Sequence, residues 1–229
     1  LRAIAVMAVL FYHLGFKWIP GGFLGVDLFF VISGYVITRL LLDSIDRSGG
    51  LDLRAFYLAR IRRLLPALAF MLATTAIAVG IWAPDTIKRF LIDTPFALTG
   101  SMNWWLVGHH LDYFEEIGRP PLLQHTWSLA VEAQFYLIWP LLVLLGLWWA
   151  RRQRGPTRPT AGSRRAVLGV LAVATAASLA YSLWVTATNP TWAYFVTPAR
   201  IWQLAAGGLV ALIAFRGLRM APWIGLVLI

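Results

Sequence analysis

Residues 126–149 have the sequence TWSLAVEAQFYLIWPLLVLLGLWW, in which Glu132 is the only charged side chain. A helix of about 20 apolar residues is long enough to cross the hydrocarbon core of a bilayer, so this stretch is predicted to span a membrane. The sequence therefore predicts an all-α protein, a polytopic transmembrane helix bundle with about seven spans. The other apolar stretches lie at 2–18, 23–42, 64–84, 166–187 and 200–215, with a seventh starting near Pro222.

The composition agrees with a membrane protein. Hydrophobic residues make up 59% of the 229 residues and charged residues 13%, which is too apolar for an ordinary soluble domain. The net charge of +10 does not indicate nucleic-acid binding, because the arginines lie between apolar stretches and not on one face of a soluble fold. The lack of cysteine excludes a disulfide framework, a thiol nucleophile and a thiolate metal site, and no metal is expected. Because the chain starts at Leu1 and stops within an apolar run, both ends are expected to be truncated.

Arginines are concentrated in two segments, 39–63 and 150–165, with six in each. The positive-inside rule predicts that both segments are cytoplasmic. The segment 85–125 has more acidic than basic residues and is predicted to lie outside. Its apolar part, 96–107, is too short to cross and is expected to form an interfacial or re-entrant helix. The composition of 150–165, rich in Pro, Gly and Ser, predicts a flexible cytoplasmic linker.

Ionisable side chains inside apolar helices are costly, so each one is a candidate functional residue. His13 lies at the outer end of the first predicted span, and Arg2 lies at its inner end. Asp27 follows after a short outer turn, so its carboxylate is predicted to fix the tautomer of the His13 imidazole and to raise its basicity. Alternatively, neither residue takes part in chemistry. His13 is then a histidine at the membrane interface, and Asp27 is an acid at the N-terminal end of its helix, where the helix dipole favours a negative charge.

A second outer cluster surrounds Glu132, which is predicted to lie about two turns inside its span. The spacing places His125, Ser128 and Phe135 on the same helical face. A glutamate in a partly apolar site is expected to be partly protonated, which suits proton transfer or the orientation of a histidine. Alternatively, Glu132 bridges two helices without a role in chemistry.

On the inner side, Arg60 and Arg63 are three residues apart and therefore neighbours on one helical face. Two guanidinium groups on one face suit a phosphate group. The alternative is that these arginines only anchor the helix on the cytoplasmic side.

Five blocks follow one another along the chain. They are LRAIAVMAVLFYHLGF (1–16), GGFLGVDLFFVISGYVI (21–37), FYLARIRRLLPAL (56–68), HTWSLAVEAQFYLIWPLL (125–142) and the weaker PARIWQLAAGGLVAL (198–212). In sequence and order they resemble the family 3 membrane acyltransferases, which are O-acyltransferases of bacterial surface polysaccharides, lipopolysaccharide, peptidoglycan or secreted small molecules. The resemblance implies that residues 1–229 are a partial acyltransferase domain, with about seven of about ten membrane helices, in the bacterial inner membrane.

The resemblance also implies roles for single residues. His13 matches the family's essential histidine near the outer surface, and Arg2 matches the arginine at the start of the same helix. Arg60 and Arg63 match the R-x-x-R pair that is thought to contact the acyl donor, and Glu132 matches the acid of the HTWSLAVE block.

Two positions depart from the family's pattern. Ala133 stands where a second glutamate is common, and Gln203 stands where the fifth block often has glutamate.

The expected function is transfer of an acyl group, in most cases acetyl, from cytoplasmic acyl-CoA to a hydroxyl group of an envelope or exported glycan. His13 would act as the general base or would carry the acyl group itself, and the sequence leaves both open. The rival interpretation is a transporter or proton relay formed by His13, Asp27 and Glu132. A relay needs ionisable groups spaced across the membrane, whereas these three crowd the outer half. A scaffold without catalysis has no supporting feature.

Overall fold

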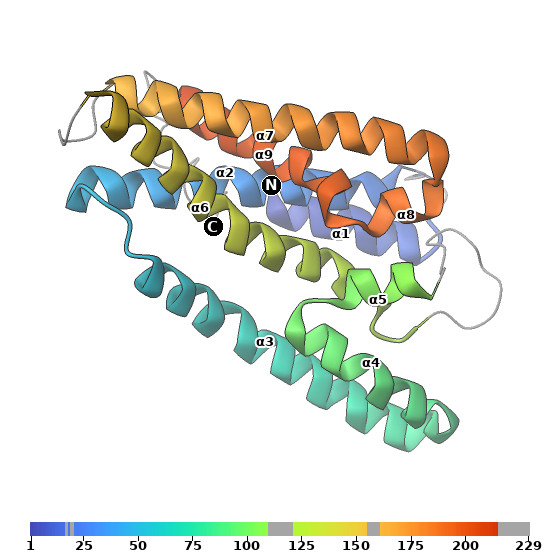
Figure 1. The fold of residues 1–229 in the computed structure, drawn as a ribbon. Coiled ribbons are helices and arrows are strands. Elements are labelled where there is room, and N and C mark those ends of the chain that lie inside the picture. Colours follow the sequence, from blue (N-terminus) through green and yellow to red (C-terminus); the bar gives the residue numbers. More distant parts are fainter. Residues whose placement is uncertain (17, 19–20, 110–120, 155–160, 215–229) are drawn as a thin grey trace. The chain divides into compact units, whose positions relative to one another are not determined.

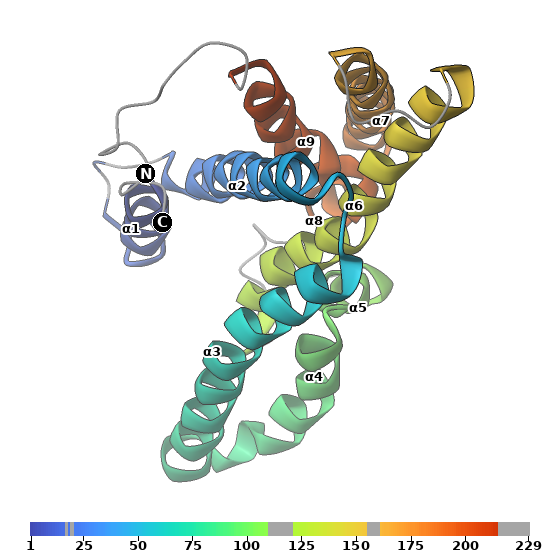
Figure 2. The same ribbon diagram turned by 90° about the vertical axis from the view of Figure 1, so that its left-hand side faces the viewer.

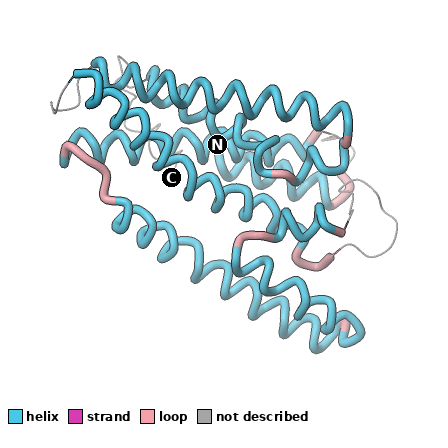
Figure 3. Tube along the Cα trace, in the orientation of Figure 1, coloured by secondary structure: helices cyan, strands magenta, loops and turns pink. Residues whose placement is uncertain are grey.

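The computed structural model describes residues 1–229 except 17, 19–20, 110–120, 155–160 and 215–229. All regular secondary structure in the described part of the chain is helical, which confirms the predicted all-α class (Figure 3). The longer helices are α1 (Arg2–His13), α2 (Gly25–Ser48), α3 (Leu53–Trp82), α4 (Ile87–Thr99), α5 (Met102–Gly108), α6 (Trp127–Arg154), α7 (Ala161–Thr188), α8 (Pro190–Phe195) and α9 (Thr197–Ala214) (Figure 1).

The chain forms two compact units. Unit 1 contains Leu1–Leu51, Phe135–Ser182 and Pro198–Ile229, and therefore α1, α2, most of α7, nearly all of α9 and the larger part of α6. Unit 2 contains Asp52–Gln134 and Leu183–Thr197, and therefore α3, α4, α5, α8, the first two turns of α6 and the end of α7.

Four helical stretches among the described residues are long and apolar enough to cross a membrane. They are Gly22–Ser48, Leu53–Trp82, Gln124–Gln153 and Arg164–Thr188. The predicted spans at 2–18 and 200–215 correspond to the shorter helix α1 and to α9. The seventh predicted span, near Pro222, lies outside the described residues.

The helices extend further into the arginine-rich segment 39–63 than the sequence predicted. Helix α2 continues to Ser48 and ends at Gly49, whose φ of 72° is the left-handed conformation that glycine adopts without strain. Helix α3 begins after Asp52, whose carboxylate accepts a hydrogen bond of 2.9 Å from the backbone N–H of Ala55. All six arginines of this segment therefore lie on helices and not in a loop.

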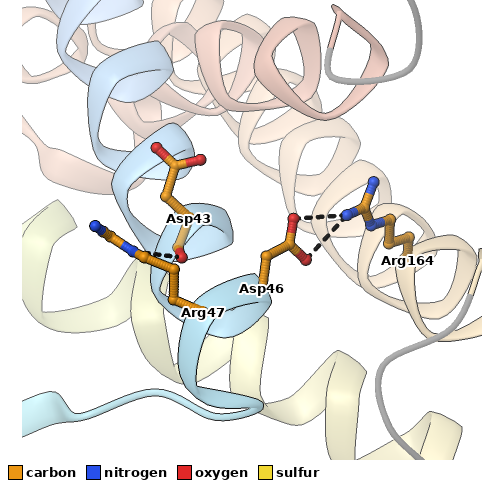
Figure 4. A network of polar contacts seen from close by, with 4 residues as sticks. All are labelled: Asp43, Asp46, Arg47 and Arg164. Carbon is orange, nitrogen blue, oxygen red and sulfur yellow. Dashed lines mark hydrogen bonds and ion pairs between the residues drawn. The ribbon is translucent and has the colours of Figure 1, made fainter.

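The helices also occupy part of the predicted linker 150–165. Helix α6 continues to Arg154, and α7 begins at Ala161. In unit 1 the guanidinium of Arg164 binds both carboxylate oxygens of Asp46, at 2.9 and 2.8 Å, so this residue is held against the end of α2 (Figure 4). The remaining part of the predicted linker, 155–160, lies outside the described residues.

The apolar stretch 96–107 was predicted to form one interfacial or re-entrant helix, and the prediction of a single helix was wrong. Helix α4 ends at Thr99, Gly100 adopts a φ of 66°, and α5 starts at Met102. Both helices are shorter than a membrane span, and α4 returns along the last turns of α3 (Figure 2).

In unit 1, α2 and α9 approach so closely that their backbones touch (Figures 1 and 2). A Cβ atom on Gly34 would lie 1.7 Å from the carbonyl oxygen of Leu204, and one on Gly207 would lie 1.8 Å from the carbonyl oxygen of Val31. Small residues permit this approach between membrane helices, where van der Waals packing replaces the hydrophobic effect as the driving force.

Helix α6 is joined to the same crossing by a buried hydrogen-bond chain. The indole N–H of Trp139 donates to the Thr38 hydroxyl at 2.8 Å, and this hydroxyl donates to the Gly34 carbonyl at 2.8 Å. The side chains of Trp139 and Thr38 are fully buried. Three helices of unit 1 are thus fixed around one glycine.

We expect Gly34→Ala to destabilise the full-length protein by about 1–3 kcal/mol or more, because the new methyl group has no space without separating α2 from α9. The matched control is Gly169→Ala on α7, where a Cβ meets no atom within 4 Å. The control should be neutral or slightly stabilising, because alanine favours helix over glycine. Thermal unfolding of the detergent-purified variants measures both, and equal melting temperatures would contradict the close packing.

Candidate active site

His13 ends α1 with an exposed ring whose orientation is fixed by its own helix. Its Nδ1 lies 2.8 Å from the carbonyl oxygen of Val9, one turn earlier. A carbonyl oxygen can only accept, so Nδ1 carries the hydrogen and Nε2 of the neutral ring is the basic nitrogen. The backbone of α1 therefore provides the tautomer that the sequence analysis had assigned to a carboxylate.

Arg2, at the opposite end of α1, binds α2. Its guanidinium donates to the buried Ser33 hydroxyl at 2.8 Å and lies 5.1 Å from the centre of the Phe29 ring. These contacts hold the first turn of α1 against α2. The predicted contact of Arg2 with an acyl donor stays a prediction.

Asp27 lies in the first turn of α2, as predicted, but its hydrogen bonds go to α9. Its Oδ1 accepts from Arg200 at 3.1 Å and from Gln203 at 2.9 Å. Asp27 shares a helical face with Val31 and Gly34, which both touch α9. The predicted pairing of Asp27 with His13 stays a prediction, and the described contacts assign this carboxylate a different partner.

Another face of α2 packs on α1. A Cβ on Gly22 would lie 2.3 Å from the Ala8 carbonyl oxygen, and one on Gly25 would lie 2.4 Å from that of Ala5. Both glycines are therefore required for close packing, and the short turn after His13 returns the chain along α1.

Glu132 lies in unit 2, two turns into the membrane-spanning stretch that begins at Gln124, and is almost completely buried. His125 is exposed in the short helical turn before α6, and its carbonyl oxygen is 3.4 Å from the Ser128 hydroxyl. Glu132 thus lies near the start of α6, and its role in the chemistry stays a prediction.

A buried amide network fixes the segment of α6 that carries Glu132. The Gln134 side-chain N–H groups donate to the Gly100 carbonyl at 2.8 Å and to Asn103 Oδ1 at 2.9 Å. The Gln134 oxygen accepts from the indole N–H of Trp104 at 3.0 Å and from the hydroxyl of Thr197. All four hydrogen-bonding positions of this amide are therefore used, which sets the rotation of α6 in unit 2.

The two arginines of the R-x-x-R pair lie on the second and third turns of α3, in unit 2. Arg60 is half-buried, with its guanidinium 5.7 Å from the centre of the Phe56 ring, whereas Arg63 is exposed. The helix confirms that both share a face and that Arg62 points elsewhere.

Asp93, on α4, is a buried acid that the sequence analysis did not single out. Its Oδ1 accepts from the indole N–H of Trp105 at 3.1 Å, and its Oδ2 has no hydrogen-bond partner among the described residues. Burial raises the pKa of this carboxyl above its usual value, against the opposing effects of the Trp105 hydrogen bond and of the charges of Arg89 and His109.

Several polar residues of these clusters were missed from the sequence. Arg200 carried a usable signal, because it is a charged residue beside an apolar stretch, as Asp27 is. Gln134 and Asn103 are uncharged, and their burial only shows in the structure. No group of three or more His, Asp or Glu side chains that could hold a metal ion occurs in the part of the chain that the structure describes.

The helices and the apolar surface define a multi-pass membrane protein. The family model described as acyltransferase domain, that of the family 3 acyltransferases, matches residues 1–229, the whole chain. The chain therefore belongs to the family 3 acyltransferases, as its sequence blocks indicated.

Curated relatives agree with the family. The chain is 38% identical over 213 residues to the peptidoglycan O-acetyltransferase OatA of Listeria monocytogenes, covering 93% of this chain and 33% of that protein. It is also 38% identical over 213 residues to the putative peptidoglycan O-acetyltransferase YrhL of Bacillus subtilis, covering 93% of this chain and 32% of the relative. A putative O-acetyltransferase of Staphylococcus aureus is 44% identical over 144 residues, which cover 63% of this chain and 24% of that protein.

The chain thus spans about a third of the length of the first two relatives. No solved structure matches it significantly.

We expect the burial of Asp93 to make stability depend on pH. Because its pKa is raised in the folded protein, the folded state keeps a proton that the unfolded chain loses near 3.8. The contribution of Asp93 to the free energy of unfolding therefore falls as the pH rises above 3.8 and through the raised pKa of the folded protein. Asp93→Asn keeps the acceptor for Trp105 without the charge, so the melting temperature of the variant should rise relative to wild type between about pH 4 and pH 7. The exposed Asp85→Asn is the control, and a parallel pH trend in both variants would contradict the assignment.

Proposed function

We propose that the full-length protein is an O-acyltransferase of the bacterial inner membrane that moves an acyl group, specifically acetyl, from cytoplasmic acyl-CoA to a hydroxyl group of an envelope glycan. The observation that carries this proposal is the exposed His13 ring, whose Nδ1 is held by the Val9 carbonyl so that Nε2 is the base. The names of the relatives OatA and YrhL support acetyl as the group and peptidoglycan as the first glycan to test.

Two routes use the same histidine. As general base, Nε2 accepts the proton of the acceptor hydroxyl while the oxygen attacks the thioester carbonyl, and the proton then goes to the departing thiolate of CoA. As acyl carrier, Nε2 attacks the thioester carbonyl and expels the thiolate of CoA, which leaves a positively charged acylimidazole. In a second step the acceptor oxygen takes the acyl group from the imidazole, and the proton of the acceptor hydroxyl goes to the thiolate. Both routes need the neutral ring with its hydrogen on Nδ1.

The donor is proposed to enter from the cytoplasmic side, where the arginine-rich helix ends lie in the topology that the positive-inside rule predicts. Arg60 and Arg63, on one face of α3, are proposed to bind the phosphates of acyl-CoA, because guanidinium groups bind phosphate oxygens through paired, charge-assisted hydrogen bonds. Arg2 is also proposed to contact the acyl donor, while its hydrogen bond to Ser33 secures α1. Glu132 is proposed to act as an acid that exchanges protons during the reaction.

The His13→Ala variant of the full-length protein should lose acyl transfer by about 10² to 10⁴ fold, because the base or carrier is removed. The control is His109→Ala: this ring is also exposed, and its Nδ1 also lies near the carbonyl one turn earlier, that of Trp105, at 2.9 Å. Ester-linked acetate on the envelope glycan, measured by mass spectrometry in cells with equal amounts of each variant, gives the result. Wild-type levels with His13→Ala would refute the proposal.

The arginine pair should affect the use of the donor. Lysine keeps the charge but not the planar fork, so Arg60→Lys and Arg63→Lys should each raise the KM for acyl-CoA by about 10-fold with a smaller change in kcat. Arg62→Lys is the matched control, since it lies on the same helix but on a different face. Equal effects at all three positions would show that the arginines only anchor α3 at the membrane surface.

A further inference from the structure

The cluster of Asp27, Arg200 and Gln203 in unit 1 uses only part of its hydrogen-bonding capacity. Both described hydrogen bonds to Asp27, from Arg200 and from Gln203, end on the same oxygen, Oδ1. No donor among the described residues reaches Oδ2. The carboxylate is therefore held through one oxygen and presents the other.

The side-chain amide of Gln203 also uses only part of its hydrogen-bonding capacity. Its side chain is 5% exposed, and its Oε1 is buried without a hydrogen-bond partner in the described part of the chain. The orientation of the amide is set by chemistry, because only the NH₂ group can donate to the carboxylate of Asp27. A buried carbonyl oxygen without a donor is rare in native proteins, so this oxygen is a candidate acceptor for a hydrogen bond from a ligand.

Two acceptor oxygens without donors, on side chains that are joined by a hydrogen bond of 2.9 Å, indicate which ligand the cluster suits. The guanidinium of Arg200 lies 3.1 Å from the carboxylate of Asp27 and balances its negative charge, so the cluster does not require a cation. It demands a neutral group that donates hydrogen bonds, and a hydroxyl group is the simplest of these.

The position of Asp27 makes this cluster accessible. The Asp27 side chain is 33% exposed, whereas that of Arg200 is 13% exposed. Charged side chains within membrane helices face the interior of the bundle or a water-filled space and not lipid. The open side of Asp27 is therefore expected to face a polar route, and not the hydrocarbon.

We infer that Asp27 and Gln203 form a subsite that binds a hydroxyl group of the acceptor glycan, with Arg200 as the positioning residue that holds the carboxylate. This inference rests on the proposed function. The contacts of Gly34 and Gly207 lie further along the same crossing of α2 and α9, so the two acceptors are fixed relative to each other. A rigid pair of acceptors discriminates in favour of ligands that supply the hydroxyl.

The test uses the full-length, detergent-purified protein with acetyl-CoA as donor. The acceptor is envelope glycan from a strain lacking the gene, treated with mild alkali to remove ester-linked acyl groups. Gln203→Met removes the buried carbonyl with little change in volume, and should raise the KM for the glycan about 10-fold while the KM for acetyl-CoA stays within about twofold. Asp27→Asn replaces the open oxygen by a donor and should act more strongly in the same direction.

Ser178→Ala is the matched structural control. The Ser178 hydroxyl binds the start of α9 through the Pro198 carbonyl and the Trp202 backbone N–H, without touching the cluster. It should lower the melting temperature and leave the KM for the glycan unchanged.

An unchanged KM for the glycan in Gln203→Met, with a lower melting temperature, would overturn the inference and leave the cluster as a clamp between helices. That result would not affect the proposed function. Absence of transfer by the wild-type protein would refute the proposed donor and glycan, and with them the inference.

Discussion

The contact between the backbones of α2 and α9 is the constraint on which the rest of unit 1 depends. It exists because Gly34 and Gly207 have no side chain where the other helix passes. Once the two helices touch there, the register of every residue along the crossing is fixed. Asp27 reaches Arg200 and Gln203 as a result, and Thr38 reaches the indole of Trp139 on α6. The charged cluster is thus a consequence of steric contact between helices.

Buried polar side chains then determine how the helices are rotated. In unit 2, the fully bonded amide of Gln134 fixes the start of α6 and so the direction of Glu132 two residues before it. In unit 1, the His13 ring has a contact within its own helix, between its Nδ1 and the carbonyl oxygen of Val9. The two groups proposed to move protons are therefore positioned in different ways. The direction of Glu132 depends on contacts between residues far apart in the sequence, whereas the His13 ring contacts the backbone of its own helix.

The sequence predicted the helices well, because apolar stretches of span length leave few alternatives in lipid. It placed several helix ends wrongly, since the polar last turns of α2 resemble a loop in composition, although Gly49 and Asp52 carry recognisable end signals. It also predicted a neighbour for Asp27 from closeness in sequence, namely His13. The partners in the structure are 173 and 176 residues away. Such pairs depend on the register of packed helices, which a single sequence does not contain.

The wide separation of Asp27 and Arg200 along the chain has a consequence for biogenesis. Ribosomes add about 5–20 residues per second, so the 173 residues between them take about 10–35 s to synthesise. During that time α2 has left the ribosome, and its acid has no cation from α9. Asp27 lies in the first turn of α2, where the end of a helix can remain hydrated until α9 arrives. The order of synthesis thus makes the charged cluster one of the last contacts to form among the described helices of unit 1.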